Sequence, residues 1–317
     1  MRESYYRPSG KLKASYFLWL ILFWLISIPI LSVAYIYAVH YLPYIWLAIF
    51  LAFGCGALLG LVINWAAKLG KVRNPAVVMV SAIVGSLLMK YVQWCVYVPL
   101  IKNVVYEWFL YEYGYTLTFL EQLLEGVINL FYPLYVLDWA LIINEYGVWA
   151  FTRNNEAVGD SVTGVILLLI WIGELIILGG TAILVSGVRP KTPFSEESGA
   201  WYVICKEAIE TDYPVDFEQF KHKLENGNFE ELLTMAAAGK SNEELFMRLV
   251  FHTAPAPSYA EKDYLSISQV SMDKKKRVKQ KEVLKYLAID QQTVVELIHN
   301  SQFIMKSKSK NKEQKQK

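Results

Sequence analysis

Hydrophobic residues gather in four long runs before position 190, and the chain after that position is predominantly polar. A membrane-spanning helix needs about 20 apolar residues, because each residue rises about 1.5 Å and the hydrocarbon core is about 30 Å thick. The runs are long enough, and they cover residues 14–39, 44–67, 76–100 and 162–186. The pattern therefore predicts an α-helical polytopic membrane protein with four transmembrane helices and a small α+β cytosolic C-terminal domain.

The same runs define the predicted domains. They are a basic cytosolic N-terminus (1–14), three transmembrane helices (15–101), an acidic, aromatic-rich outer or interfacial region (102–161), a fourth transmembrane helix (162–188), a cytosolic domain of helices and a β-hairpin (195–305), and a lysine-rich tail (306–317). We expect the tail to be disordered, because its lysines have no apolar residues with which to form a core.

Charge distribution predicts the orientation, although the formal net charge is only +2. Lysine and arginine flank the runs at 2–13, 68–73 and 189–191, whereas residues 103–160 contain eight acidic residues and a single basic one, Arg153. Because lysine and arginine near span ends favour the cytosolic side, we expect both termini in the cytosol and residues 103–160 outside. The cell (plasma) membrane is the expected location.

Residues 126–150 are interfacial, re-entrant or a further span. The segment is apolar but contains Pro133 and Asp138. A fifth crossing would place the C-terminal domain opposite the basic N-terminus, so we favour interfacial or re-entrant helices. The carboxylates of this region lack the Glu-x-x-His element of di-metal sites. They indicate a solvated acidic surface, and we expect no metal.

Two charges interrupt the apolar runs, Lys90 in the third and Glu174 in the fourth. Lys90 follows Pro75 by fifteen residues and Glu174 precedes Arg189 by fifteen, so each lies about 22 Å from the same boundary. Equal depth makes them a candidate intramembrane pair, since a lone charge in hydrocarbon is costly. In the alternative, Lys90 extends its ammonium to the far interface and leaves Glu174 protonated.

Small residues in the second run predict a helix-packing face. Gly56 and Gly60 form a small-xxx-small pattern, which lets another helix backbone approach closely. The three cysteines, Cys55, Cys95 and Cys205, show no disulfide or metal spacing.

The C-terminal domain is predicted to start with four short helices. They begin at Ser195, Asp216, Asn228 and Ser241, and the last has a capping box. A strand at 264–272, then either a returning strand or a strand passing into a helix at 277–289, and a final helix at 291–304 follow.

A basic stretch within this domain is a candidate anionic-lipid contact. It contains Lys274, Lys275, Lys276 and Arg277, and such residues are attracted to an acidic leaflet. A helix-turn-helix over 283–299 would instead bind nucleic acid. In the third alternative the stretch is simply a solvated hairpin, because runs of charge are usually solvated faces. We do not expect nucleic acid as a partner, because the domain balances its charge.

No phosphate-binding loop, nucleophile elbow or zinc-protease motif occurs in the sequence. We therefore expect a non-enzymatic protein without a cofactor, whose cytosolic domain docks a cytosolic or membrane protein partner or organises a membrane complex. One alternative is a transporter or channel component that uses Lys90 and Glu174. A second alternative is a membrane enzyme acting on lipid.

Overall fold

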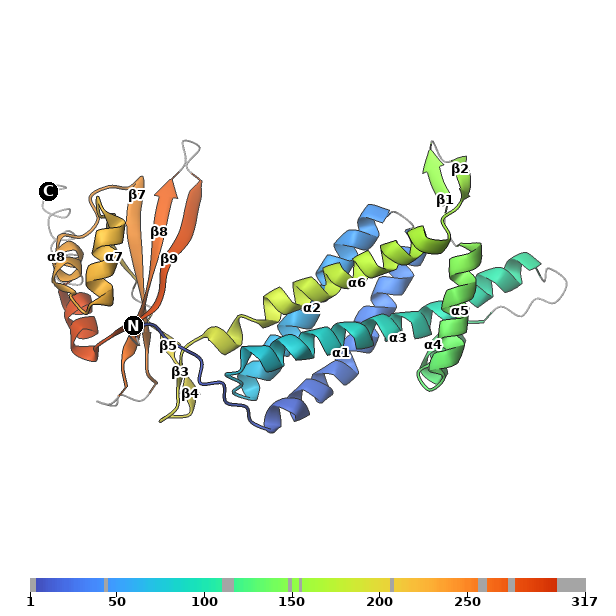
Figure 1. Cartoon of the computed structure of the whole chain (residues 1–317), viewed down its shortest axis with the longest axis horizontal. Helices are drawn as coiled ribbons and strands as arrows, with labels where there is room; N and C mark the ends of the chain where they lie inside the picture. Colours follow the sequence, from blue (N-terminus) through green and yellow to red (C-terminus); the bar gives the residue numbers. More distant parts are fainter. Residues whose placement is uncertain are drawn as a thin grey trace, which may run out of the picture. The chain divides into compact units, whose positions relative to one another are not determined.

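The computed structural model describes residues 4–42, 45–109, 117–147, 150–153, 156–205, 208–255, 261–272 and 277–300. The chain divides into two compact units (Figure 1). The helical unit comprises Ser9–Lys191, and the C-terminal unit comprises Thr192–Lys317 together with the segment Met1–Pro8.

Four long helices are the main elements of the helical unit, and each covers nearly all of one apolar run. They are α1 (Ser15–Tyr41), α2 (Ile45–Leu69), α3 (Pro75–Phe109) and α6 (Gly164–Ser186). Each is long and apolar enough to cross a membrane, which is compatible with the predicted class. Helix α3 continues beyond the predicted end near residue 100, and its 35 residues make it about 52 Å long.

Helices α3 and α6 run antiparallel. Ser86 lies beside Gly179 near one end of the contact, and Ile101 shares a buried cluster with Leu167 near the other. The chain therefore leaves α3 and enters α6 at the same end of the helical unit.

Three basic segments of the sequence meet at the opposite end of the helical unit. We call this end the basic end. The Arg73 N–H donates to the Lys11 carbonyl at 3.0 Å, and the Arg189 N–H donates to Asn64 Oδ1 at 3.0 Å. The start of α1, the α2–α3 turn and the end of α6 consequently lie together.

Two shorter helices, α4 (Phe119–Asn129) and α5 (Pro133–Tyr146), form a pair bent by 114°. They pack on the second half of α3, where Asn129 Nδ2 donates to the Cys95 carbonyl at 3.1 Å. Pro133 starts α5, a position where its missing N–H costs no helical hydrogen bond. A hairpin of β1 (Ala150–Arg153) and β2 (Glu156–Ser161) follows. Phe119 at the start of α4 contacts Tyr37 near the end of α1, and Asn144 of α5 donates to the Gly164 carbonyl at the start of α6. The α4–α5 pair therefore begins and ends at one end of the unit, which favours the interfacial or re-entrant interpretation.

An antiparallel sheet is the centre of the C-terminal unit. Strands β5 (Val203–Ile204) and β6 (Ile209–Asp212) both pair with β7 (Leu245–Thr253), which is followed in order by β8 (Asp263–Met272) and β9 (Val278–Ile289). Helices α7 (Phe217–Glu225) and α8 (Glu230–Ala238) cover one face (Figure 1). Their Phe220 and Leu232 share a buried core with Leu249 and Ile267 of the sheet.

Sequence reasoning predicts part of this unit and misses part. The helices at 216 and 228, the strands at 264–272 and 277–289, and a final helix, described over 291–300, are confirmed. The helix predicted from Ser195 is wrong, because β3 (Phe194–Ser195), β4 (Ala200–Trp201) and β5 occupy that region. The tail at 306–317 lies outside the described residues.

The helix predicted from Ser241 is also wrong, because strand β7 forms in that region. The predicted capping residues Ser241 and Asn242 instead bond through their backbone N–H groups to Asp212 Oδ1, at 2.8 and 3.0 Å. Strand β7 is paired on both sides, by β6 and β8, and these distant partners override the local helical pattern. Because β9 includes residues 283–289, the helix-turn-helix alternative is wrong as well.

The N-terminal segment adds a short strand-like stretch to β9. The Tyr6 N–H donates to the Tyr286 carbonyl at 2.9 Å, and the Ala288 N–H donates to the Ser4 carbonyl at 2.7 Å. The Tyr5 hydroxyl donates to Glu225 Oε1 of α7 at 2.5 Å. Burial and the Glu225 carboxylate raise the pKa of Tyr5, so this hydroxyl remains a donor at physiological pH.

Close approach of α2 to α6 generates a first prediction. A Cβ on Gly56 would overlap the Leu178 carbonyl, whereas a Cβ on Gly54 would meet nothing within 4 Å. We expect Gly56→Ala to destabilise the protein by about 1–3 kcal/mol, because backbone would have to shift. Thermal melting of detergent-purified protein measures the effect, with Gly54→Ala as the matched control. Equal melting of the two variants would contradict the packing described.

Candidate functional site

An ion pair joins α3 and α6 inside the helical unit. Lys90 Nζ lies 2.7 Å from Glu174 Oε2, and the two side chains are only 16% and 11% exposed. The structure thus brings together the two charges that the sequence places at equal depth. Each neutralises the other where water is scarce, which relieves the cost of burying either alone.

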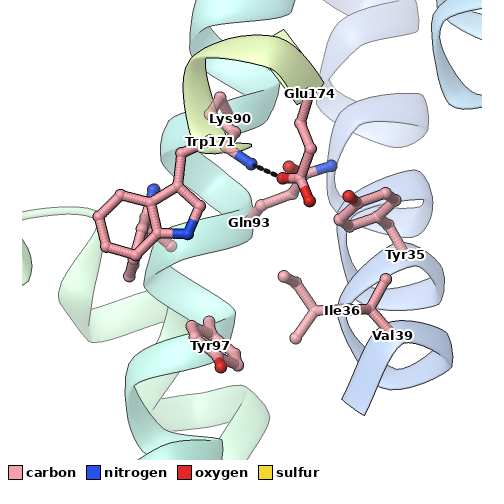
Figure 2. Close-up of a pocket in the computed structure, with 9 residues that line it drawn as sticks. Tyr35, Ile36, Val39, Lys90, Gln93, Tyr97, Trp171 and Glu174 are labelled. Atoms are coloured by element: carbon pink, nitrogen blue, oxygen red, sulfur yellow. Dashed lines mark hydrogen bonds and ion pairs between the residues drawn. The ribbon is translucent and has the colours of Figure 1, made fainter. Parts of the chain in front are cut away.

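Two side chains, one from α1 and one from α3, flank this pair. Figure 2 shows the Tyr35 hydroxyl turned toward the Glu174 carboxylate and the Gln93 side chain close to the same group. The Lys90 ammonium lies 5.9 Å from the centre of the Tyr35 ring, within the range of a cation–π interaction. Helix α1 therefore contributes to a site that the sequence indicates only on α3 and α6.

A small cavity of about 50 Å³ opens beside the pair, which is room for a few water molecules. Its aromatic wall comes from Trp94 and Trp171, whose ring centres are 4.7 Å apart at 85°, and from Tyr97. Ile36 and Val39 supply the apolar wall on α1 (Figure 2). Because these residues lie beyond the pair as seen from the basic end, the cavity extends toward the other end.

On the side of the ion pair that faces the basic end, α1 and α3 pack closely against each other. Ser32 and Met89 are both 0% exposed, and Ser32 Oγ donates to the Met89 carbonyl at 3.3 Å. Ser86, one turn further along α3, is buried and donates to the Ala82 carbonyl at 2.7 Å. The cavity is consequently one-sided in the described part of the chain.

The other predicted site residues lie elsewhere. Gly56 and Gly60 are at the α2–α6 contact, where a Cβ on Gly60 would come within 2.8 Å of the Ala182 carbonyl oxygen. Arg277 is exposed just before β9, and Lys274, Lys275 and Lys276 fall outside the described residues.

The acidic residues of the α4–α5 region are structural in part. Glu121 closes a capping box with Thr118 at the start of α4. Glu125 forms an ion pair with Lys102, so it is not the solvated surface charge that the sequence suggests. Within the described ranges, no three histidine, cysteine or acidic side chains are grouped so as to hold a metal ion.

Gln93 is the residue of this site that sequence reasoning passes over. It is 1% exposed, and neither amide atom hydrogen bonds to another described residue. The available signal is its spacing of three from Lys90 in an otherwise apolar run, because residues three apart share one face of a helix.

Comparison with known proteins adds no relative: no family model, curated protein or solved structure matches the chain.

The pair yields a prediction that separates a structural contact from two independent charges. Lys90→Met or Glu174→Leu alone should lower the amount of folded protein, by about 3 kcal/mol of stability, because each leaves a buried charge unpaired. The double substitution should restore folding, since apolar residues can replace a buried pair. Size-exclusion profiles of detergent extracts measure the outcome.

An exposed ion pair provides the control for this experiment. Lys223 and Glu231 lie 2.9 Å apart with side chains 44% and 41% exposed, so Glu231→Ala should change stability by less than about 1 kcal/mol. Additive losses in the double variant would show that Lys90 and Glu174 do not support each other.

Proposed function

We propose that this is a non-enzymatic, four-span integral membrane protein whose cytosolic C-terminal domain docks a protein partner or organises a membrane complex. The observation that carries the proposal is the N-terminal segment bound to β9. This segment continues into α1, and the domain also follows directly from α6. A folded module joined to the membrane unit at two points is suited to holding a partner at the bilayer.

The basic end supports a cytosolic orientation for both termini. It gathers Lys and Arg residues that are separated in sequence, namely Lys11, Lys13, Lys68, Lys71, Arg73, Arg189 and Lys191. Basic residues next to span ends favour the cytosolic side. The proposal accordingly has the α4–α5 pair on the outer side, with the cell membrane as the proposed location.

An open strand edge on β9 supports docking. The Tyr6 N–H donates to the Tyr286 carbonyl and the Ser4 carbonyl accepts from the Ala288 N–H, and both of these β9 residues lie near the end of the strand. Within the described residues, Val278–Glu282 is exposed and has no strand on its outer side. Such an edge can accept an extended segment from another protein.

The one-sided cavity favours a second candidate, a transporter or channel component. Intramembrane charges commonly mark solute or ion pathways. Passage would require the packed layer at Ser32 and Met89 to open. We therefore rank docking above transport.

The orientation can be tested by cysteine labelling in intact cells. In a variant lacking Cys55, Cys95 and Cys205, a cysteine at exposed Glu145 of α5 should react with an impermeant maleimide. A cysteine at exposed Gln219 of α7 should react only after the cells are opened. The reverse pattern would overturn the orientation, and labelling of both in intact cells would mean that α6, the long helix between the two positions, does not cross the membrane.

Docking at β9 can be tested with a photo-crosslinking residue in place of Lys279. We expect one discrete adduct between this variant and a second protein in native membranes. The same crosslinker at Gln219, exposed on the helical face, serves as the control and should not give that adduct. Identical adducts at both positions, or none at Lys279, would contradict docking at this edge.

A further inference from the structure

The cavity beside the ion pair contains an unsatisfied polar group. The Gln93 side chain is only 1% exposed. Its amide nitrogen and its amide oxygen both lack a hydrogen-bond partner among the described residues. Buried amides are normally paired, because an unpaired one loses its hydration without compensation. Gln93 lines the cavity, so its NH₂ group can donate to, and its carbonyl oxygen can accept from, a molecule that enters.

The neighbouring charges restrict what can enter. The contact between Lys90 Nζ and Glu174 Oε2 uses one of three ammonium hydrogens and one of two carboxylate oxygens. A lone anion would be repelled by Glu174, and a lone cation by Lys90. A molecule carrying both charges can place its anionic oxygens at Lys90 and its ammonium at Glu174, which keeps the site neutral.

Size and shape restrict the ligand further. About 50 Å³ admits only a very small molecule or the charged end of a larger one, by comparison with the space that a water molecule needs. The walls formed by Trp171 and Val39 can cover the apolar part of such a molecule, and Tyr35 adds a hydroxyl beside Glu174 (Figure 2).

From this geometry we infer that the cavity binds a compact zwitterion with a primary ammonium group, through Lys90, Glu174 and Gln93. Two sources supply this chemistry: a free α-amino acid entering from the outer side, or the ethanolamine headgroup of a phospholipid in the outer leaflet. The inference is independent of the docking proposed for the C-terminal domain.

The test uses the full-length protein in nanodiscs of phosphatidylcholine, whose quaternary ammonium cannot donate a hydrogen bond. L-alanine is titrated calorimetrically, with ethylamine and propionate as single-charge analogues. We expect L-alanine to bind measurably more tightly than either analogue. Gln93→Met should weaken binding by about tenfold or more, because it removes two hydrogen bonds to the ligand.

The lipid source is tested by replacing phosphatidylcholine with phosphatidylethanolamine. If the headgroup is the ligand, the wild-type protein melts at a higher temperature in phosphatidylethanolamine, and Gln93→Met loses that difference. Thr181→Val, a buried change on α6 outside the cavity, is the control and should behave as wild type. If Gln93→Met does not fold, the Lys90→Met, Glu174→Leu double variant takes its place.

The cavity variant is Gln93→Met, or the double variant that takes its place. A response to either zwitterion that is lost in the cavity variant supports the inference. The inference is overturned if ethylamine or propionate binds as tightly as L-alanine. It is equally overturned if neither L-alanine nor phosphatidylethanolamine distinguishes the wild-type protein from the cavity variant.

Discussion

A lysine inside an apolar helix has to be neutralised, and this requirement constrains the helical unit. Insertion of a charge at mid-membrane costs about 2.5–3.5 kcal/mol on translocon scales, which is a large share of the stability of a small domain. Pairing Lys90 with Glu174 fixes the relative depth of α3 and α6. Tyr35 then brings α1 to the same level, so three of the four long helices meet at one polar layer.

The remaining long helix, α2, is positioned by close backbone packing at glycines rather than by charge. Helix α2 approaches α6 at Gly56 and Gly60, where the backbone carbonyls of Leu178 and Ala182 occupy the space of a Cβ. Lipid provides no hydrophobic driving force between helices, so helices in a membrane associate through close packing of this kind. Polar pairing on one face of α6 and small residues on another together define how the four helices pack.

Much of the helical unit is predictable from sequence, because span length and charge depth depend on local composition alone. Lys90 and Glu174 could be matched by counting residues from Pro75 and Arg189. The C-terminal sheet was harder, since β7 is a strand only because β6 and β8 flank it. No local signal identifies Ser4–Tyr6 as a partner of β9, which lies 280 residues away. Gln93 was visible in sequence, but its lack of a partner is a property of the fold.

Charge exchange between α3 and α6 tests the central claim most directly. Lys90→Glu alone and Glu174→Lys alone place like charges together, and each should reduce the yield of folded protein sharply. The exchanged variant, with both substitutions, restores an opposite pair at the same depth. If the ion pair organises the helical unit, the exchanged variant should be recovered at a higher folded yield than either single reversal in size-exclusion profiles. If the losses of the two single reversals instead add up in the exchanged variant, the claim that the ion pair organises the helical unit is contradicted.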